Sequence, residues 1–296
     1  MDKTQNFYNS NIKIVLTILD KANIDYKNSF PTVLKIVDIL NGHKKYSRRT
    51  ISNYLMSVIK YLRDQKQDGK LIDEYSKYRN DLQKDINKGD SQNANMKSLK
   101  NPLTYDDIVK FRDEQKIGSL DHLILSLYTC MPVRRVNDFT QMVYIKKDKK
   151  GLPTDKNYYI IDSHTFIYNK YKTAHKYGQY KYVLNESKPV ELVLINTINS
   201  FLKNFMKEKG LKQKDVDNLP LYGEQYTDNA MSKIITKMIK KKFKCNVGAT
   251  EIRHLYLTHI YSTKLNKMSV DDINNLALSM GTSAMQSLKY RKLDEE

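Results

Sequence analysis

The sequence predicts a two-domain protein that is mainly α-helical and contains a small antiparallel β-sheet. Apolar residues recur at helical spacing through much of the first hundred residues. A polar stretch follows, and three short segments that show β-branched and aromatic alternation come before helical spacing returns. At 296 residues the chain is long enough for two domains that each bury a core of their own.

Two helices are predicted in the N-terminal part. The segment SFPTVLKIVDILNG begins with Ser and Pro, a typical helix start, and ends at Gly42. The segment SRRTISNYLMSVIKYLRDQ repeats the apolar pattern. The residues expected near one face of each helix are Val33, Ile36, Val37, Ile39 and Leu40 in the first, and Ile51, Leu55, Val58, Ile59 and Leu62 in the second.

A domain boundary is expected near residues 90–101. The stretch KDINKGDSQNANMKSLKNP is polar, contains a glycine and is a candidate linker. Beyond it, Thr104 is predicted to cap a new helix, with Asp107 at the capping-box position. We therefore expect a helical domain at 1–95, a linker at 96–101 and a second domain, with a β-hairpin insert, at 102–296.

The second domain is predicted to be helical with one inserted β-sheet. DHLILSLYTC is typical of a buried helix, and NYYIIDS, HTFIYN and QYKYVL are typical of short antiparallel strands. Helical spacing returns in ELVLINTINSFLKNFMKEKG. Ser269 and Asp272 are expected to cap VDDINNLALSM, which Gly281 ends, and Ser283 is expected to open a last short helix that carries Tyr290.

The charge of the chain favours a polyanionic partner. The net charge is +18, and we expect nucleic acid rather than a membrane surface, because no long basic amphipathic helix stands out. No apolar run approaches the ~18 residues of a membrane span, and the N-terminus does not resemble a signal peptide. The two cysteines lack metal-ligand spacing, so we expect an intracellular, reducing location and neither metal nor cofactor.

Four segments carry the candidate chemistry, in a fixed order. YTCMPVRRVNDF places Arg135 three residues before Asp138, and FIYNKYKTAHKYGQYKYVL places Lys172 near a strand turn. ATEIRHLYLTHIYS places Arg253 in the first turn of a helix, and MGTSAMQSLKY ends on Tyr290. Arginine is scarce here, because only nine of the 51 basic residues are arginines, so each arginine position is informative.

Each residue alone also has an ordinary structural interpretation. Arg135 and Asp138 are spaced like an exposed helical ion pair, and Arg253 could stabilise a surface helix. Lys172 is one of many lysines, and Lys170 or Lys176 fits the same turn. The shared order and spacing of the four segments, rather than any one of them, favours a joint function.

In these segments the chain resembles the tyrosine recombinase, or phage integrase, family. That family carries an Arg-x-x-acid motif, a lysine on a β-hairpin, a His-x-x-Arg-His helix start, a Leu-Gly-His segment and a nucleophilic tyrosine. The resemblance covers roughly residues 100–290, and the PVRRVNDF form is most similar to integrases of eukaryotic DNA viruses and mobile elements. It implies a two-domain clamp on duplex DNA, with a core-binding domain at 1–95 and a catalytic domain at 102–296.

The resemblance also implies roles for single residues. Arg135 and Arg253 would neutralise the scissile phosphate, because a guanidinium forks onto two non-bridging oxygens. Tyr290 would attack to give a 3′-phosphotyrosyl intermediate without a metal, and Lys172 would protonate the leaving 5′ oxygen. Asp138 would orient Arg135. Further candidate DNA contacts are Arg48, Arg49, Arg134, Lys170 and Lys176.

The sequence departs from the family at both histidines. Thr250 stands at the first histidine position and is expected to cap the helix that follows, and Thr282 stands at the second. His254 and His175 are the nearest imidazoles that could compensate. A type IB topoisomerase and a non-catalytic DNA-binding relative therefore stay open as alternatives.

The resemblance further implies integration or recombination of viral or mobile DNA in the nucleus or cytoplasm of a host cell. It also implies self-assembly on DNA as a dimer or tetramer. Only six residues follow Tyr290, so we expect contacts between protomers to use an element other than a long C-terminal helix.

Overall fold

The computed structural model describes residues 3–43, 46–93 and 103–289, and the chain divides into two compact units, Met1–Ala94 and Asn95–Glu296. The assignment of these units as core-binding and catalytic domains stays a prediction, and the expected linker at 96–101 lies outside the described residues. Within the described ranges, no helix combines the length and apolar content needed to cross a membrane.

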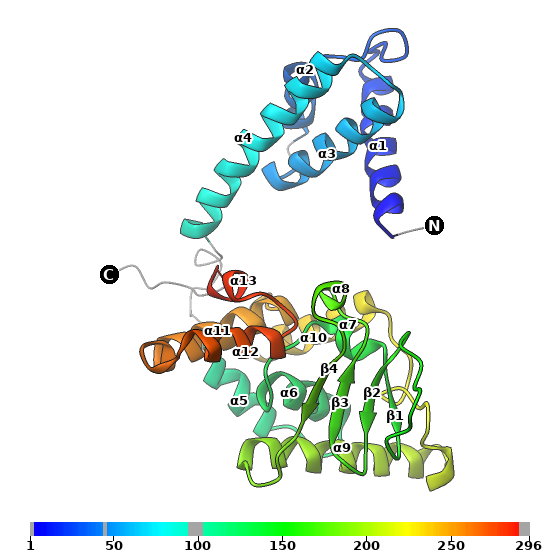
Figure 1. Ribbon diagram of the computed structural model, residues 1–296, viewed down its shortest axis with the longest axis vertical. Helices are drawn as coiled ribbons and strands as arrows, with labels where there is room; N and C mark the ends of the chain where they lie inside the picture. The colour runs from blue at the N-terminus through cyan, green and yellow to red at the C-terminus, as the bar shows by residue number, and fades with distance from the viewer. Residues whose placement is uncertain (1–2, 44–45, 94–102, 290–296) are drawn as a thin grey trace. The chain divides into compact units, whose positions relative to one another are not determined.

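Unit 1 consists of helices packed on one apolar core (Figure 1). Its helices are α1 (Lys3–Lys21), α2 (Val33–Gly42), α3 (Arg48–Asp64) and α4 (Gly69–Asn93). The predicted helices at 33–42 and 48–64 are confirmed, and α3 begins where the Ser47 hydroxyl accepts a hydrogen bond from the Thr50 N–H. The apolar faces are buried as expected, except that Ile39 is only partly buried.

The N-terminal part of the stretch expected to be a linker is helical, which corrects that expectation. The residues KDINKGDSQN, which we expected to lie in a polar connection, continue α4 as far as Asn93. Helix α4 packs mainly on α3, and it carries few apolar residues over these last turns. Low apolar content alone therefore did not distinguish the end of this helix from a linker.

Unit 2 surrounds a four-stranded sheet with helices (Figure 1). Its helices are α5 (Tyr105–Asp113), α6 (Leu120–Thr129), α7 (Val136–Thr140), α8 (Ala174–Tyr177), α9 (Pro189–Glu208), α10 (Asp228–Phe243), α11 (Ala249–Lys264), α12 (Val270–Ser279) and α13 (Ala284–Lys289). Two 3-10 turns, Gln213–Asp215 and Leu265–Lys267, join α9 to α10 and α11 to α12. The predicted capping boxes at Thr104 and Ser269 are both present.

The sheet is mixed rather than antiparallel. Its order is β1 (Met142–Ile145), β2 (Asn157–Ile160), β3 (Thr165–Tyr168) and β4 (Tyr180–Val183). The three predicted strands pair antiparallel, with Tyr159 opposite Phe166 and Phe166 opposite Tyr182. Strand β1 was not predicted, and it pairs parallel to β2. All four of its residues are buried, as are those of β2 and β3, and its short apolar run does not by periodicity distinguish a strand from a buried helix.

Candidate active site

The connection between α6 and α7 sends two adjacent arginines in different directions. Arg135 is the N-cap residue of α7 and has an extended backbone, with φ −77° and ψ 156°. Consecutive side chains on an extended backbone point to opposite sides. Arg134 accordingly enters the interior, where it has no exposed surface, and Arg135 stays half-buried.

Arg134 fills a polar and aromatic cage. Its Nε donates to Asp138 Oδ2 at 2.9 Å, and its Nη1 donates to the Ser279 carbonyl at 2.6 Å. The guanidinium carbon lies over three tyrosine rings, at 3.7, 4.9 and 5.5 Å from the centroids of Tyr168, Tyr171 and Tyr180. The cage thus joins α7, the β3–β4 hairpin and the end of α12 through one cation.

These contacts correct two expectations from the sequence. Asp138 is fully buried and pairs with Arg134, whereas the sequence analysis assigned it to Arg135. Arg134 was expected to touch DNA, but its side chain is inaccessible in this conformation. Burial raises the pKa of the Asp138 carboxyl, and the charge of Arg134, followed by those of Arg135 and Arg253, opposes that rise.

Arg135 and Arg253 meet at one turn, between α12 and α13. Arg135 Nη1 donates to the Gly281 carbonyl at 2.6 Å. Arg253 is buried in the first turns of α11, and its Nη1 donates to the Met280 carbonyl at 3.1 Å and to Val133 at 2.5 Å. The structure therefore brings together the two arginines that the sequence marked as phosphate ligands.

The turn itself has the geometry of a Schellman helix end. Gly281 N–H bonds to the Leu278 carbonyl and Thr282 N–H to the Ala277 carbonyl, both at 2.9 Å. Gly281 has φ +64°, and a Cβ at this position would lie 2.8 Å from Arg134 Nη2. Thr282, at the second family histidine position, is buried in this turn.

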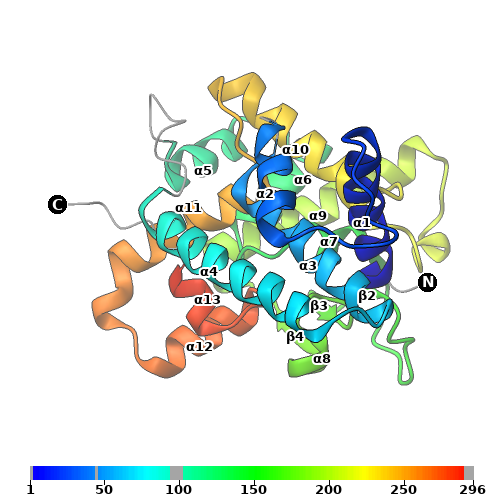
Figure 2. The same ribbon diagram turned by 90° about the horizontal axis from the view of Figure 1, so that it is seen from above.

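The hairpin that carries the candidate lysine is anchored beside the same turn. Thr173 Oγ1 donates to the Gly281 carbonyl at 3.1 Å, and Figures 1 and 2 show α8, in the β3–β4 connection, beside α12 and α13. The side chains of Lys170, Lys172 and Lys176, all in this connection, are exposed. The connection thus presents exposed lysines, and its Thr173 shares the Gly281 carbonyl with Arg135.

Asn157 fixes the start of this connection. Its buried amide nitrogen donates to the carbonyls of Asp138 and Lys170, at 2.8 and 2.9 Å. Its amide oxygen accepts from the N–H groups of Asn169 and Lys170. One side chain on β2 therefore ties the arginine-bearing segment to the hairpin.

The start of α11 corrects the role expected of Thr250. The helix begins at Ala249, Gly248 is its N-cap residue, and the Glu251 carboxylate accepts from the Gly248 N–H at 3.0 Å. Thr250 is exposed inside the first turn and does not cap the helix. His254 is partly buried next to Arg253 on the same helix, and His175 is exposed on α8.

The candidate nucleophile lies outside the described residues. Helix α13 is described to Lys289, the residue before Tyr290. Ser287 Oγ on α13 and Tyr261 Oη on α11 lie 2.7 Å apart, so α13 is held to the helix that carries Arg253. The roles of Tyr290, Lys172 and the arginines stay predictions.

Arg48 and Arg49, the other candidate DNA contacts, lie in unit 1. They occupy the first turn of α3, and both are exposed. Arg48 forms a surface ion pair with Asp85 at 3.1 Å.

Several members of this site gave no signal in the sequence. Thr173 and Asn157 look like ordinary polar loop and strand residues, and the acceptors at 279–281 are main-chain carbonyls, which have no residue type to read. Among the described residues, no group of three or more His, Cys, Asp or Glu side chains is placed to hold a metal. The chemistry available at the site is charge neutralisation by guanidiniums.

Comparisons with known proteins find likenesses among solved structures. No family model and no curated protein matches the chain. The solved structure titled "Crystal structure of XerA recombinase" is similar at 11% sequence identity and a TM-score of 0.41, over 97% of this chain and 88% of that one. At this identity and score, function has to be argued from the residues themselves.

Proposed function

We propose that this protein breaks and rejoins DNA by the chemistry of a tyrosine recombinase. One observation carries the proposal: Arg135 and Arg253, from segments far apart in the sequence, both donate to adjacent carbonyls of the Met280–Gly281 turn. That turn is followed directly by α13, which leads to Tyr290. The order of the motifs in the sequence and the net charge of +18 support the same function.

The proposed reaction uses the arginines on the phosphate. Guanidiniums that now bond carbonyl oxygens have the donor geometry to bond the non-bridging oxygens of a phosphodiester. The hydroxyl of Tyr290 gives up its proton to solvent water, and its oxygen bonds to phosphorus while the bond from phosphorus to the 5′ oxygen breaks. Lys172 supplies the proton that the 5′ oxygen takes up. Reversal of these steps, with a 5′ hydroxyl as the nucleophile, releases Tyr290 and rejoins the strand.

In this scheme Thr250 and Thr282 cannot replace the two family histidines as proton acceptors. Thr282 is buried in the turn, and a hydroxyl is not basic enough near neutral pH to take the tyrosine proton. The charge neutralisation by Arg135 and Arg253 does not depend on those histidines. We therefore expect a slower reaction with the same intermediate.

The finer assignments belong to the same proposal. The two units clamp duplex DNA, with Arg48 and Arg49 on unit 1 and Lys170 and Lys176 on unit 2 near phosphates. The protein assembles as a dimer or tetramer on its site and integrates or recombines viral or mobile DNA inside a host cell. Binding should fall steeply between about 50 and 200 mM salt, because lysine contacts to phosphates release counterions.

A covalent-trap assay tests the central step. The protein is incubated with nicked duplexes from the ends of its own genetic element, in EDTA, and the products are separated on denaturing gels. We expect a protein–DNA adduct that is lost in Tyr290→Phe, with DNA binding retained. Tight binding without an adduct would favour the non-catalytic alternative, and site-independent relaxation of supercoiled plasmid would favour the topoisomerase alternative.

A further inference from the structure

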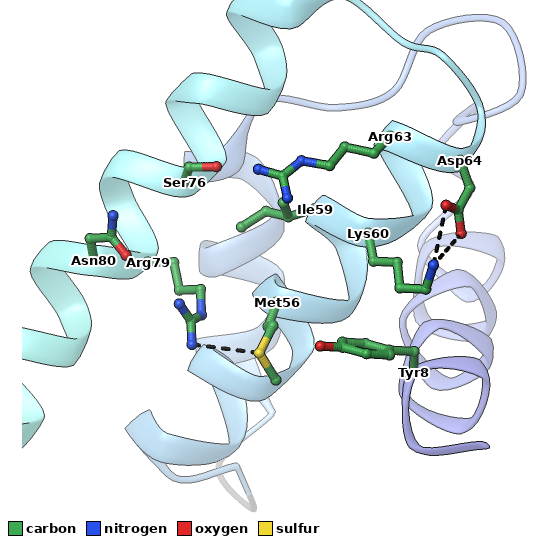
Figure 3. Close-up of a pocket in the computed structure, with 9 residues that line it drawn as sticks. All are labelled: Tyr8, Met56, Ile59, Lys60, Arg63, Asp64, Ser76, Arg79 and Asn80. Atoms are coloured by element: carbon green, nitrogen blue, oxygen red, sulfur yellow. Dashed lines mark hydrogen bonds and ion pairs between the residues drawn. The ribbon is translucent and has the colours of Figure 1, made fainter. Parts of the chain in front are cut away.

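A second group of basic side chains lines a groove in unit 1, which contains none of the residues given a role in cleavage. The groove has a volume of about 430 Å³ and lies among α1, α3 and α4 (Figure 3). Ile59 and Met56 of α3 contribute apolar surface. Its polar lining includes Tyr8, Lys60, Arg63, Ser76, Arg79 and Asn80. We call it the Arg63–Arg79 groove.

The charges in this groove are unbalanced. Lys60 Nζ lies 3.2 and 3.0 Å from the two carboxylate oxygens of Asp64, so the one acidic group of the lining is already paired. Among the described residues, neither Arg63 nor Arg79 has a carboxylate within ion-pair distance. The groove therefore keeps an excess of two positive charges on opposite walls, α3 and α4.

Arg79 is the less hydrated of the two arginines. It is partly buried, and its Nη2 contacts the Met56 sulfur at 3.6 Å, which is a weak acceptor. Its Nε is buried and has no hydrogen-bond partner among the residues that the structure describes. A buried donor without an acceptor is unfavourable, so this guanidinium lacks the full set of acceptors that it can bind.

Arg63 and Arg79 line the same groove from two different helices, α3 and α4. Figure 3 shows the Arg63 side chain reaching from α3 toward Ser76 of α4, and Arg79 reaching from α4 toward Met56 of α3. A tetrahedral oxyanion accepts several hydrogen bonds and matches the planar fork of arginine. Tyr8 and Asn80 line the same groove and add neutral hydrogen-bonding groups.

We propose that the Arg63–Arg79 groove binds a phosphate group. Its volume exceeds what one phosphate fills, so the phosphate belongs to a larger ligand, either a mononucleotide or the backbone of bound DNA. If DNA is the source, the inference rests on the proposed function and adds a fixed phosphate contact in unit 1. If a mononucleotide is the source, the groove is a small-molecule site that is independent of cleavage.

The test measures binding of inorganic phosphate, a mononucleotide and a duplex of unrelated sequence to the full chain. The variants are Arg63→Gln and Arg79→Gln, and Lys35→Gln, an exposed lysine on α2, is the control for loss of one charge. We expect each arginine variant to weaken at least one probe about tenfold, as the loss of a charge-assisted bond predicts. Lys35→Gln should change that probe by less than twofold.

The probes separate the two sources. Weakened mononucleotide binding identifies a small-molecule site. Unchanged mononucleotide binding, with a salt dependence of DNA binding that falls by about one charge, identifies a backbone phosphate. If Arg79→Gln lowers the thermal midpoint, Arg79→Lys keeps the charge without the fork and should bind with intermediate affinity. Arginine variants that match Lys35→Gln with all three probes would overturn the proposal.

The covalent-trap assay keeps this result apart from the proposed function. At saturating protein, Arg79→Gln should still form the adduct, because the groove takes no part in cleavage. If the wild-type chain forms no adduct, the recombinase proposal is refuted. If Arg79→Gln nevertheless loses the phosphate or nucleotide binding of the wild-type chain, the proposal for the Arg63–Arg79 groove is retained.

Discussion

Arg134 should contribute more to stability than any surface ion pair of unit 2. Replacing it in Arg134→Met leaves the Asp138 carboxyl buried without its partner and removes the bond to Ser279. Removing one partner of a buried pair costs about 3–5 kcal/mol. The contact with the Tyr168 ring at 3.7 Å adds to this loss. We therefore expect Arg134→Met to lower the free energy of unfolding by an amount in the upper part of that range.

Urea unfolding followed by circular dichroism measures this loss, since the chain contains no tryptophan to report by fluorescence. Hydrogen exchange in β3 and α12 localises the change to unit 2. Lys149→Met is the matched control, because Lys149 is exposed and its partner Asp217 only partly buried, so this pair should contribute at most about 1 kcal/mol.

Two features of the result follow from the buried charge. Arg134→Met/Asp138→Leu should be more stable than Arg134→Met, because it leaves no unpaired carboxylate. In Arg134→Met, the pKa of Asp138, already raised by burial, rises further. The folded state then binds a proton that the unfolded state lacks, so the deficit shrinks as pH falls toward about 4. A loss of unfolding free energy below about 1 kcal/mol in Arg134→Met would refute this reasoning. A loss that changes neither with the added Asp138→Leu substitution nor with pH would also refute it.

Three further predictions concern the same unit. Gly281→Ala should destabilise the fold and reduce adduct formation, because a Cβ would lie 2.8 Å from the Arg134 guanidinium. The control is Gly210→Ala, at the similar φ of +65° with open space around it. In a thermal melt this control should show only the cost of the backbone strain. Asn157→Asp loses two amide donors to buried carbonyls, so it should cost about 1–3 kcal/mol and speed hydrogen exchange in the hairpin; unchanged exchange would contradict the anchoring role. Burial raises the pKa of Tyr144 well above its usual range, as it does for other core tyrosines, so the stability that these groups contribute is present below about pH 10 and lost as pH rises further; tyrosinate absorbance should therefore rise in two phases, the second coinciding with unfolding, and a single phase ahead of unfolding would contradict it.

Much of the helical framework was predictable because its signals are local. The Ser269–Asp272 capping box and the glycine end at Gly281 depend on a few adjacent residues, and both are present in the structure. The three antiparallel strands follow from alternation within each strand. The buried strand β1 and the polar end of α4 were missed, because their composition reflects packing partners rather than their own conformation.

The contacts of the candidate site residues could not be predicted from the sequence. Spacing alone assigned Asp138 to Arg135, because the two lie three residues apart, as on a helix. The extended backbone at Arg135 breaks that assumption and turns Arg134 toward the carboxylate instead. The carbonyls of Met280 and Gly281 receive the arginines through the path of the main chain, which only the fold determines.

The α12–α13 turn also determines the stage of folding at which the candidate site assembles. Its partners lie far back along the chain: 145 residues separate Arg134 from Ser279, and 146 separate Arg135 from Gly281. Contacts that close such long loops form late in folding, since the loss of chain entropy precedes the gain. In a chain emerging from the ribosome, Arg134 and Arg135 are therefore present before the turn that accepts their hydrogen bonds. If the protein cuts DNA as proposed, an unfinished molecule cannot leave a broken strand, because completion of the fold and assembly of the cutting centre are the same event.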